Sequence, residues 1–253
     1  MRPTLALRNP AWLLALGLAS GALIRYVAFK RGVGRATALA AACERYERRV
    51  SAGALSILVL GDSTGVGVGA SRPEESIAGR LGVDFPEADI VNVSRSGARV
   101  CDAIAQAREC ASLELRFDLA VLHVGSNDVV RATNAGELAA DCETLMLEMA
   151  RIADRTVWLG PTNVGLAPLF PPPYSWLVAA RSRAAARIFA RSAAKHDVAF
   201  IDFTTPEHVE HLGRNREGGF AVDRFHPSST TYGYGYAAAR GAMRLASGAS
   251  TRV

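Results

Sequence analysis

The chain has 253 residues, 49% of them apolar and 21% charged, with a net charge of +5. Residues 1–50 hold nine Lys or Arg and two Glu, a net charge of +7, whereas the remaining residues carry a net charge of −2. The length suits one sizeable α/β domain with an appendage, and the charge distribution argues against a nucleic-acid-binding surface on the main domain. It favours an anionic partner, lipid head groups, near the start of the chain.

The first predicted element is an apolar N-terminal segment. Residues 9–24 contain no charge, and the apolar run resumes after Arg25 as far as Phe29. A spanning helix needs about 20 residues, and Arg25 can extend the usable length by reaching the interface. We expect residues 1–35 to associate with a membrane through residues 10–29; the alternative is an apolar helix packed on the main domain. Flanking basic residues favour the cytoplasmic face, with a periplasmic domain on an uncleaved anchor as the alternative.

Residues 36–51 are predicted to form a helical linker, and residues 52–248 a domain in which strand and helix patterns alternate. Five strands separated by helices predict βαβ units, a parallel sheet and helices on both of its faces. The segments 161–173 and 204–224 show no element, and because both follow strands we interpret them as substrate loops. Strands are expected at 56–60, 90–93, 119–124, 156–159 and 198–203, and helices at 76–81, 100–111, 135–153, 176–196 and 231–246.

The four cysteines have no metal-site spacing. Cys101 and Cys110 fall in one predicted helix, nine residues apart, which separates them by about 13 Å and exceeds the reach of a disulfide. We therefore expect no metal, no cofactor and no disulfide framework.

The stretch Gly61-Asp62-Ser63 follows the first predicted strand, where the chain must turn toward a helix. In open α/β sheets ligands lie at the carboxyl ends of the strands, so a serine here is placed to act as a nucleophile. Ser63 taken alone is better explained as a helix cap, because serine is common at that position.

Three further blocks follow in chain order. Gly97 comes after the second strand and offers an unobstructed N–H; Asn127, after the third, offers a side-chain amide for an oxyanion. Asp223 and His226 are three residues apart, so that the carboxylate can orient the imidazole as a general base. His123 and His196 are interpreted as structural.

Together, Gly61-Asp62-Ser63, Gly97, Gly125-x-Asn127-Asp128 and Asp223-x-x-His226 resemble the four blocks of the SGNH, or GDSL, hydrolase superfamily, in the family's order. The resemblance covers about residues 53–245. It implies a three-layer α/β/α flavodoxin-like domain with a five-stranded parallel sheet, and hydrolysis of carboxylic esters. The first block differs from the commonest form in having Thr64 after the serine, which puts the substrate class in question.

The resemblance implies an acyl-enzyme on Ser63, with His226 as base and Asp223 as its orienting group. The oxyanion would be held by the N–H groups of Ser63 and Gly97 and by the Asn127 amide. The apolar N-terminus favours a lipid-like ester among small-molecule substrates.

Two alternatives remain at this point. The run Gly65-x-Gly67-x-Gly69 after the first strand suggests a nucleotide loop, although its spacing differs from GxGxxG. A non-catalytic binding domain on the same fold is the second alternative. If the serine is a nucleophile, the three glycines are interpreted as small residues that keep the space beside it open.

Overall fold

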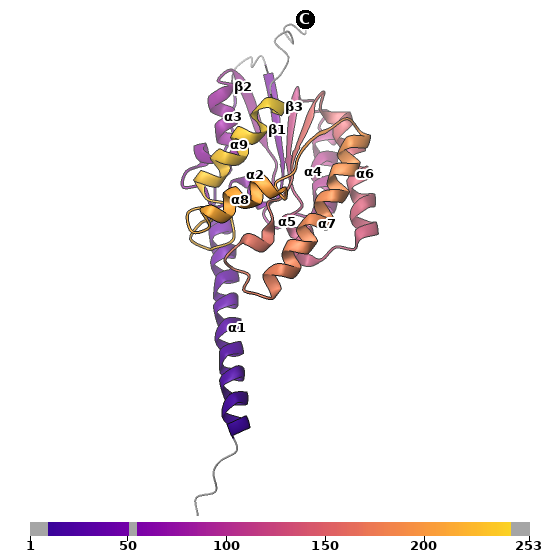
Figure 1. Ribbon diagram of the computed structural model, residues 1–253. Helices are drawn as coiled ribbons and strands as arrows, with labels where there is room; N and C mark the ends of the chain where they lie inside the picture. The colour runs from indigo at the N-terminus through magenta and orange to yellow at the C-terminus, as the bar shows by residue number, and fades with distance from the viewer. Residues whose placement is uncertain (1–9, 51–54, 244–253) are drawn as a thin grey trace, which may run out of the picture.

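A computed structural model describes residues 10–50 and 55–243 of the chain, and for residues 10–19 and 22 the backbone alone. Five parallel strands form one sheet in the order β2-β1-β3-β4-β5, with helices on both faces (Figure 1). The predicted three-layer α/β/α fold, preceded by an N-terminal helix, is confirmed. The strands are β1 (Leu55–Gly61), β2 (Ala88–Asn92), β3 (Leu119–His123), β4 (Thr156–Leu159) and β5 (Ala199–Ile201). The helices are α1 (Pro10–Ala42), α2 (Ser63–Val66), α3 (Ile77–Asp84), α4 (Val100–Ser112), α5 (Ser126–Arg131), α6 (Ala135–Ile152), α7 (Tyr174–Lys195), α8 (Pro206–Arg214) and α9 (Ser229–Met243), with 3-10 turns η1 (Pro73–Glu75) and η2 (Val164–Leu166).

The sheet separates two apolar cores. Leu58 and Leu60 of β1 pack with α4, α6 and α7, whereas Ile57 and Val59 pack on the other face with α3 and α9. Successive side chains of a strand point to opposite faces, so a strand covered on both sides must be apolar at every position. Each fully buried Leu or Ile contributes about 1.5–3 kcal/mol. This packing fixes the carboxyl ends of β1, β2 and β3, from which the site is built.

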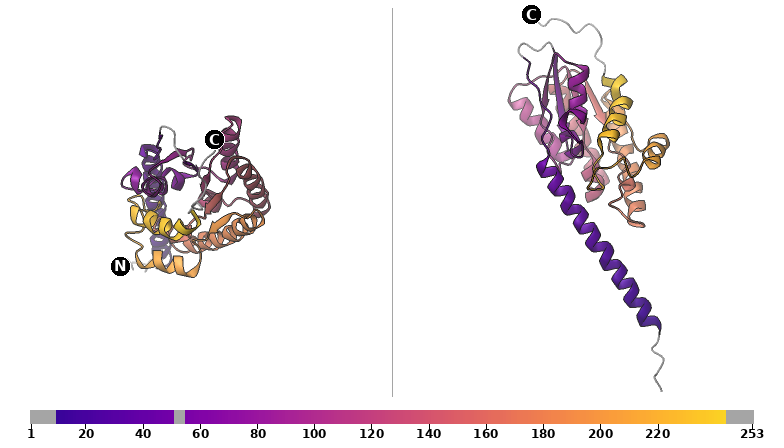
Figure 2. Two further views of the ribbon diagram at one scale, coloured as in Figure 1. Left: turned by 90° about the horizontal axis from the view of Figure 1, so that it is seen from above. Right: turned by 90° about the vertical axis from the view of Figure 1, so that its left-hand side faces the viewer.

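Helix α1 is continuous and projects from the domain on the side where the strands end (Figures 1 and 2). It passes without a break through residue 35, where we predicted a boundary. Its later turns contact the domain: Gly32 is buried against Leu169, and the rings of Phe29 and Phe170 have centroids 6.3 Å apart.

Among residues 10–50 and 55–243, no helix combines the length and apolarity needed to cross a membrane. Residues 1–9 of the predicted membrane segment lie outside the described part, as do the side chains of residues 10–19. The association of residues 10–29 with a membrane therefore stays a prediction.

The predicted linker helix over 36–51 is wrong beyond Ala42. Arg48 instead pairs with Ile90 of β2 through its backbone, and its guanidinium donates to the carbonyls of Gly82 and Ala88. These hydrogen bonds hold residues near Arg48 in an extended path along the sheet edge, which a helix would not allow.

The prediction that 204–224 holds no element is also wrong, because α8 lies within it. Pro206 occupies the first turn, where its missing N–H costs nothing, and Leu212 is buried. Helices α2 and α5 were not predicted either. Each is too short to give the two turns of apolar periodicity on which a helix prediction depends.

Candidate active site

The turn from β1 into α2 presents Ser63. Asp62 caps α2, its Oδ1 accepting from the Thr64 N–H at 2.8 Å and the Thr64 hydroxyl at 2.6 Å. Gly61 has φ +149°, and a Cβ there would lie 2.1 Å from the carbonyl oxygen of His123. Only glycine fits this close approach of two strand ends, so residue 61 sets the sharp turn that leads into Ser63.

Three side chains form a hydrogen-bonded relay. The Oγ of Ser63 lies 3.0 Å from Nε2 of His226, and Nδ1 of His226 lies 2.5 Å from Oδ2 of Asp223. In the tautomer that carries its proton on Nδ1, the Nδ1–H donates to the carboxylate and Nε2 accepts from the serine hydroxyl. All three side chains are buried, His226 being 5% exposed. The structure thus brings together the three predicted catalytic residues.

The carboxylate of Asp223 is held by more than the imidazole. Its Oδ1 accepts from the backbone N–H groups of Phe225 and His226, at 2.9 and 3.0 Å. Burial raises the pKa of Asp223, but the hydrogen bonds from His226 and from these N–H groups outweigh it, and the pKa lies below its ordinary value. The group is therefore a carboxylate at neutral pH, able to orient the imidazole.

Two of the three predicted oxyanion donors, Gly97 and Asn127, follow β2 and β3, the strands on either side of β1. Asn127, in the first turn of α5, donates through Nδ2 to the carbonyl of Ala98 at 3.0 Å, next to Gly97. Gly97 has φ +85°, and a Cβ there would lie 3.7 Å from the Arg131 guanidinium, an ordinary contact. The Asn127 amide has two N–H bonds, so one remains for a ligand. The structure brings Asn127 and the Gly97 block together.

A small hollow opens beside Ser63. It has a volume of about 30 Å³, space for about two water molecules. Both predicted substrate loops contribute to it, the first through Pro161, Thr162, Val164 and Ala167 and the second through Phe220. Its other lining residues are Ser63, Thr64, His123, Ser126, Phe225, His226 and Pro227.

Sequence reasoning missed the part that His123 plays in this hollow. We predicted structural roles for His123 and His196; His196 lies 3.0 Å from Glu143, away from the hollow, whereas His123 lines it. Burial lowers the pKa of His123 to about 4, so its imidazole is neutral near pH 7. Its Nδ1 is buried without a partner among the described residues.

The sequence analysis predicts no role of their own for two other buried residues near Ser63. Gln106 of α4 is fully buried and bonds to both backbone groups of Gly61, at 3.0 Å each. Asp62 is also fully buried, and burial raises its pKa to about 6. A glutamine in the middle of a helix is ordinary in sequence, and only the packing of α4 on β1 places its amide at the nucleophile turn.

The interpretation of Gly65, Gly67 and Gly69 as residues that keep space open is wrong. A Cβ at Gly65 would lie 2.3 Å from the Ser94 hydroxyl, and one at Gly69 would lie 2.3 Å from the Pro227 carbonyl. These glycines permit close packing against neighbouring segments. The N–H groups of residues 66, 67 and 68 donate to the carbonyls of Asp62 and Ser63, so they are not offered to a phosphate and the nucleotide-loop alternative loses its support.

Comparison with solved structures finds the same fold. The structure of TesA is 21% identical in sequence to this chain and superposes with a TM-score of 0.59. The match covers 75% of this chain and 98% of TesA. A catalytic mutant of Axe2, an acetylxylan esterase from Geobacillus stearothermophilus, is 20% identical with a TM-score of 0.59, over 79% and 98% of the two chains. A lipolytic G-D-S-L family protein from Veillonella parvula is 17% identical with a TM-score of 0.59, over 75% and 99%.

No curated protein matches the sequence. The profile of the GDSL-like lipase/acylhydrolase family matches residues 59–237, a range that begins on β1, ends in α9 and contains all four predicted blocks. With this match and the fold described above, the chain belongs to the GDSL-like lipase/acylhydrolase family and is an ester hydrolase.

Proposed function

We propose that the chain hydrolyses carboxylic esters through an acyl-enzyme on Ser63. The observation that carries this proposal is the relay of 3.0 and 2.5 Å from the Ser63 hydroxyl through His226 to Asp223. A serine hydroxyl is a weak nucleophile until a base accepts its proton, and His226 is within reach to do so.

The proposed reaction has two steps. Ser63 Oγ bonds to the acyl carbon as its proton passes to His226 Nε2; the ester C–O bond then breaks and His226 returns that proton to the departing alcohol. Water attacks the acyl carbon with its proton going to His226, and the bond to Ser63 breaks as the serine regains a proton. The N–H groups of Ser63 and Gly97 and the free N–H of Asn127 would hold the oxyanion in each step.

The volume of the hollow favours a short acyl group. About 30 Å³ beside Ser63 accepts an acetyl or similar group, whereas a long chain requires the loops around it to move. We therefore propose that the preferred esters carry a small acyl group. A series of p-nitrophenyl esters with acyl chains of increasing length tests this: activity should fall steeply beyond the shortest members, and a rise toward long chains would contradict it.

The N-terminus supports a proposal that the enzyme works at a membrane. Residues 1–50 hold the excess positive charge, and Leu23, Ile24 and Tyr26 of α1 are 60–69% exposed. Fractionation of cells that express the full chain tests this proposal. Recovery of the protein in the soluble fraction alone, with none in the washed membranes, would contradict it.

The catalytic proposal is tested with the full chain on p-nitrophenyl acetate. Ser63→Ala should abolish turnover and labelling by a fluorophosphonate. Ser126→Ala, which removes the other serine hydroxyl that lines the hollow, should retain labelling. Labelling that survives the first variant and disappears in the second would assign the nucleophile to Ser126.

A further inference from the structure

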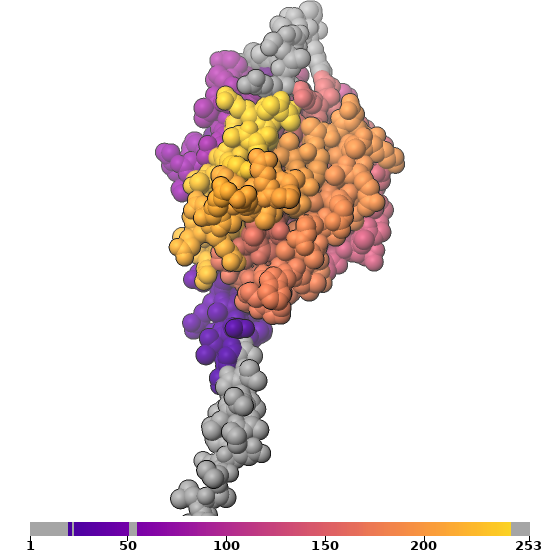
Figure 3. Space-filling view, viewed as in Figure 1, coloured from indigo at the N-terminus to yellow at the C-terminus, as the bar shows by residue number. Residues whose placement is uncertain are grey.

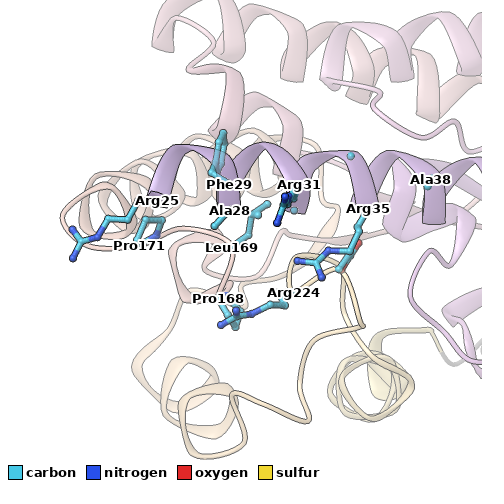
Figure 4. A pocket seen from close by; sticks show the side chains of 13 residues that line it. Arg25, Ala28, Phe29, Arg31, Arg35, Ala38, Pro168, Leu169, Pro171 and Arg224 are labelled. Atoms are coloured by element: carbon cyan, nitrogen blue, oxygen red, sulfur yellow. The ribbon is translucent and has the colours of Figure 1, made fainter. Parts of the chain in front are cut away.

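A large groove lies between α1 and the loop segments next to the catalytic acid. Its volume is about 740 Å³, far larger than the hollow beside Ser63. One wall is α1 from Arg25 to Ala38, and the other is formed by Pro168, Leu169 and Pro171 together with Asp223 and Arg224 (Figure 4).

The groove is strongly basic. Arg25, Arg31, Arg35 and Arg224 line it, all four are exposed, and none forms an ion pair with the described part of the chain. Figure 4 shows Arg31 and Arg35 on the α1 wall, with Arg224 on the facing wall. The only acid in the lining is Asp223, whose carboxylate is already bonded to His226. An anionic group entering here meets uncompensated guanidinium groups, which suit phosphate oxygens.

The groove is also apolar between its arginines. Ala28, Phe29, Leu169 and Pro171 contribute apolar surface to it. Large exposed side chains lie close in the chain to its lining residues: Ile24 precedes Arg25 on α1 and Trp176 follows Pro171 at the start of α7, each 69% exposed. Figure 3 shows α1 emerging beside the start of α7 and the loop before it. Arginines alternating with exposed aromatic and aliphatic side chains are typical of surfaces that lie in the bilayer interface.

The groove is tied to the catalytic loop. The Leu169 N–H donates to the Arg224 carbonyl at 3.0 Å. Phe170 packs edge-on against Phe225 at 5.8 Å, and Phe225 packs edge-on against the His226 imidazole at 4.9 Å. A phosphate head group in the groove therefore lies against the segment that holds His226, at the carboxyl end of the sheet, where Ser63 lies.

We infer that this groove binds the phosphate head groups of an anionic bilayer, seating the catalytic edge of the domain on the membrane surface. The inference rests on the proposed membrane association and is independent of the acyl-enzyme. A nucleic acid or an acidic peptide would satisfy the arginines alone, whereas a bilayer satisfies both the arginines and the exposed apolar rim.

The test measures co-sedimentation of the full chain with vesicles of phosphatidylcholine alone or mixed with phosphatidylglycerol. All variants carry Ser63→Ala, so that hydrolysis plays no part. Each arginine near an anionic surface changes affinity by about fivefold, so Arg31→Gln with Arg35→Gln should weaken binding to mixed vesicles by roughly 25-fold. Their binding to phosphatidylcholine alone should not change.

The matched control is Arg187→Gln with Arg191→Gln, which removes the same charge from two exposed positions on α7. This variant should keep the preference of the parent for anionic vesicles. Equal losses of binding in the two double variants would assign the effect to net charge and overturn the inference that the groove is the binding site. Equal binding of the parent to both vesicle types, or binding to neither, would also overturn it. A thermal unfolding midpoint equal to that of the parent verifies that each variant is folded.

Discussion

The side-chain amide of Gln106 makes two hydrogen bonds of 3.0 Å to the backbone of Gly61, accepting from its N–H and donating to its carbonyl. In this way α4 provides the acceptor for the Gly61 N–H and a second donor to the Gly61 carbonyl, which also accepts from the Arg95 N–H. Ser63 follows two residues later, so Gln106 fixes the origin of the nucleophile turn. It acts through Gly61, as a positioning residue.

Replacing Gln106 by Leu should therefore lower both stability and turnover. The Gly61 carbonyl keeps its bond from the Arg95 N–H, but the Gly61 N–H is left buried without an acceptor, at a cost of about 1–3 kcal/mol. We expect kcat to fall with KM little changed, because no contact to the substrate is removed. Urea unfolding and ester kinetics measure both effects. Ala105→Leu, at the adjacent exposed position of α4, is the control and should leave both unchanged.

The Asn127 amide should affect catalysis more than stability. Asn127→Ala removes the proposed oxyanion donor and should reduce kcat by about 10²–10³-fold. The hydrogen bond to Ala98 is lost as well, at about 1 kcal/mol. Asn134→Ala removes an asparagine that caps α6, with a similar cost in stability, and should leave kcat unchanged. Equal kcat values in the two variants would exclude Asn127 from the oxyanion site.

Asp62 and His123 should give opposite dependences of stability on pH. Burial raises the pKa of Asp62 from 3.8 to about 6, so the native state binds more protons than the unfolded state between these values. Stability falls as the pH rises through that window, by about 3 kcal/mol. Burial lowers the pKa of His123 from 6.5 to about 4, so the unfolded state binds more protons, and this contribution rises with pH by about the same amount.

Because the two contributions nearly cancel in the parent, single variants should expose them. Between about pH 4 and 6.5, the stability of Asp62→Asn should rise more steeply with pH than that of the parent. The stability of His123→Gln should instead fall as the pH rises over the same range. Urea unfolding at the two ends of the range measures both slopes. Parallel slopes in all three proteins would contradict the burial of these groups.

Gly69 should be intolerant of a side chain. Its φ is +97°, and a Cβ there would lie 2.3 Å from the Pro227 carbonyl and 3.1 Å from the His226 Cβ. Gly69→Ala should therefore displace the His226 segment and lower both stability and kcat. Gly213→Ala in α8, where a Cβ meets nothing within 4 Å, should instead raise stability by up to about 1 kcal/mol. Similar effects of the two substitutions would show that the packing at Gly69 is not tight.

The parallel sheet could be predicted because its strands are apolar at every position and separated by amphipathic helices. All five predicted strands lie within two residues of the observed bounds. Ser63, Asp223 and His226 could be predicted as a group because they occur in short blocks of fixed spacing, and the structure places them within hydrogen-bond distance.

The remaining features depend on contacts between segments far apart in the chain. Gln106 meets Gly61 only because α4 packs across β1, and the groove exists only because α1 contacts the loop at Leu169. The interpretation of Gly65 and Gly69 as residues that keep space open is wrong for the same reason. A glycine-rich run is compatible with either an open space or close packing, and only its neighbours decide between them.

The most direct test of the proposed mechanism is to trap the acyl-enzyme. The full chain is mixed with p-nitrophenyl acetate, quenched in acid during the first turnover, digested and analysed by mass spectrometry. The proposal predicts that the peptide containing Ser63 gains the mass of one acetyl group, and that the Ser63→Ala variant shows no acetylated peptide. Acetylation of another residue in both proteins, or turnover with no acetylated peptide in either, would contradict it.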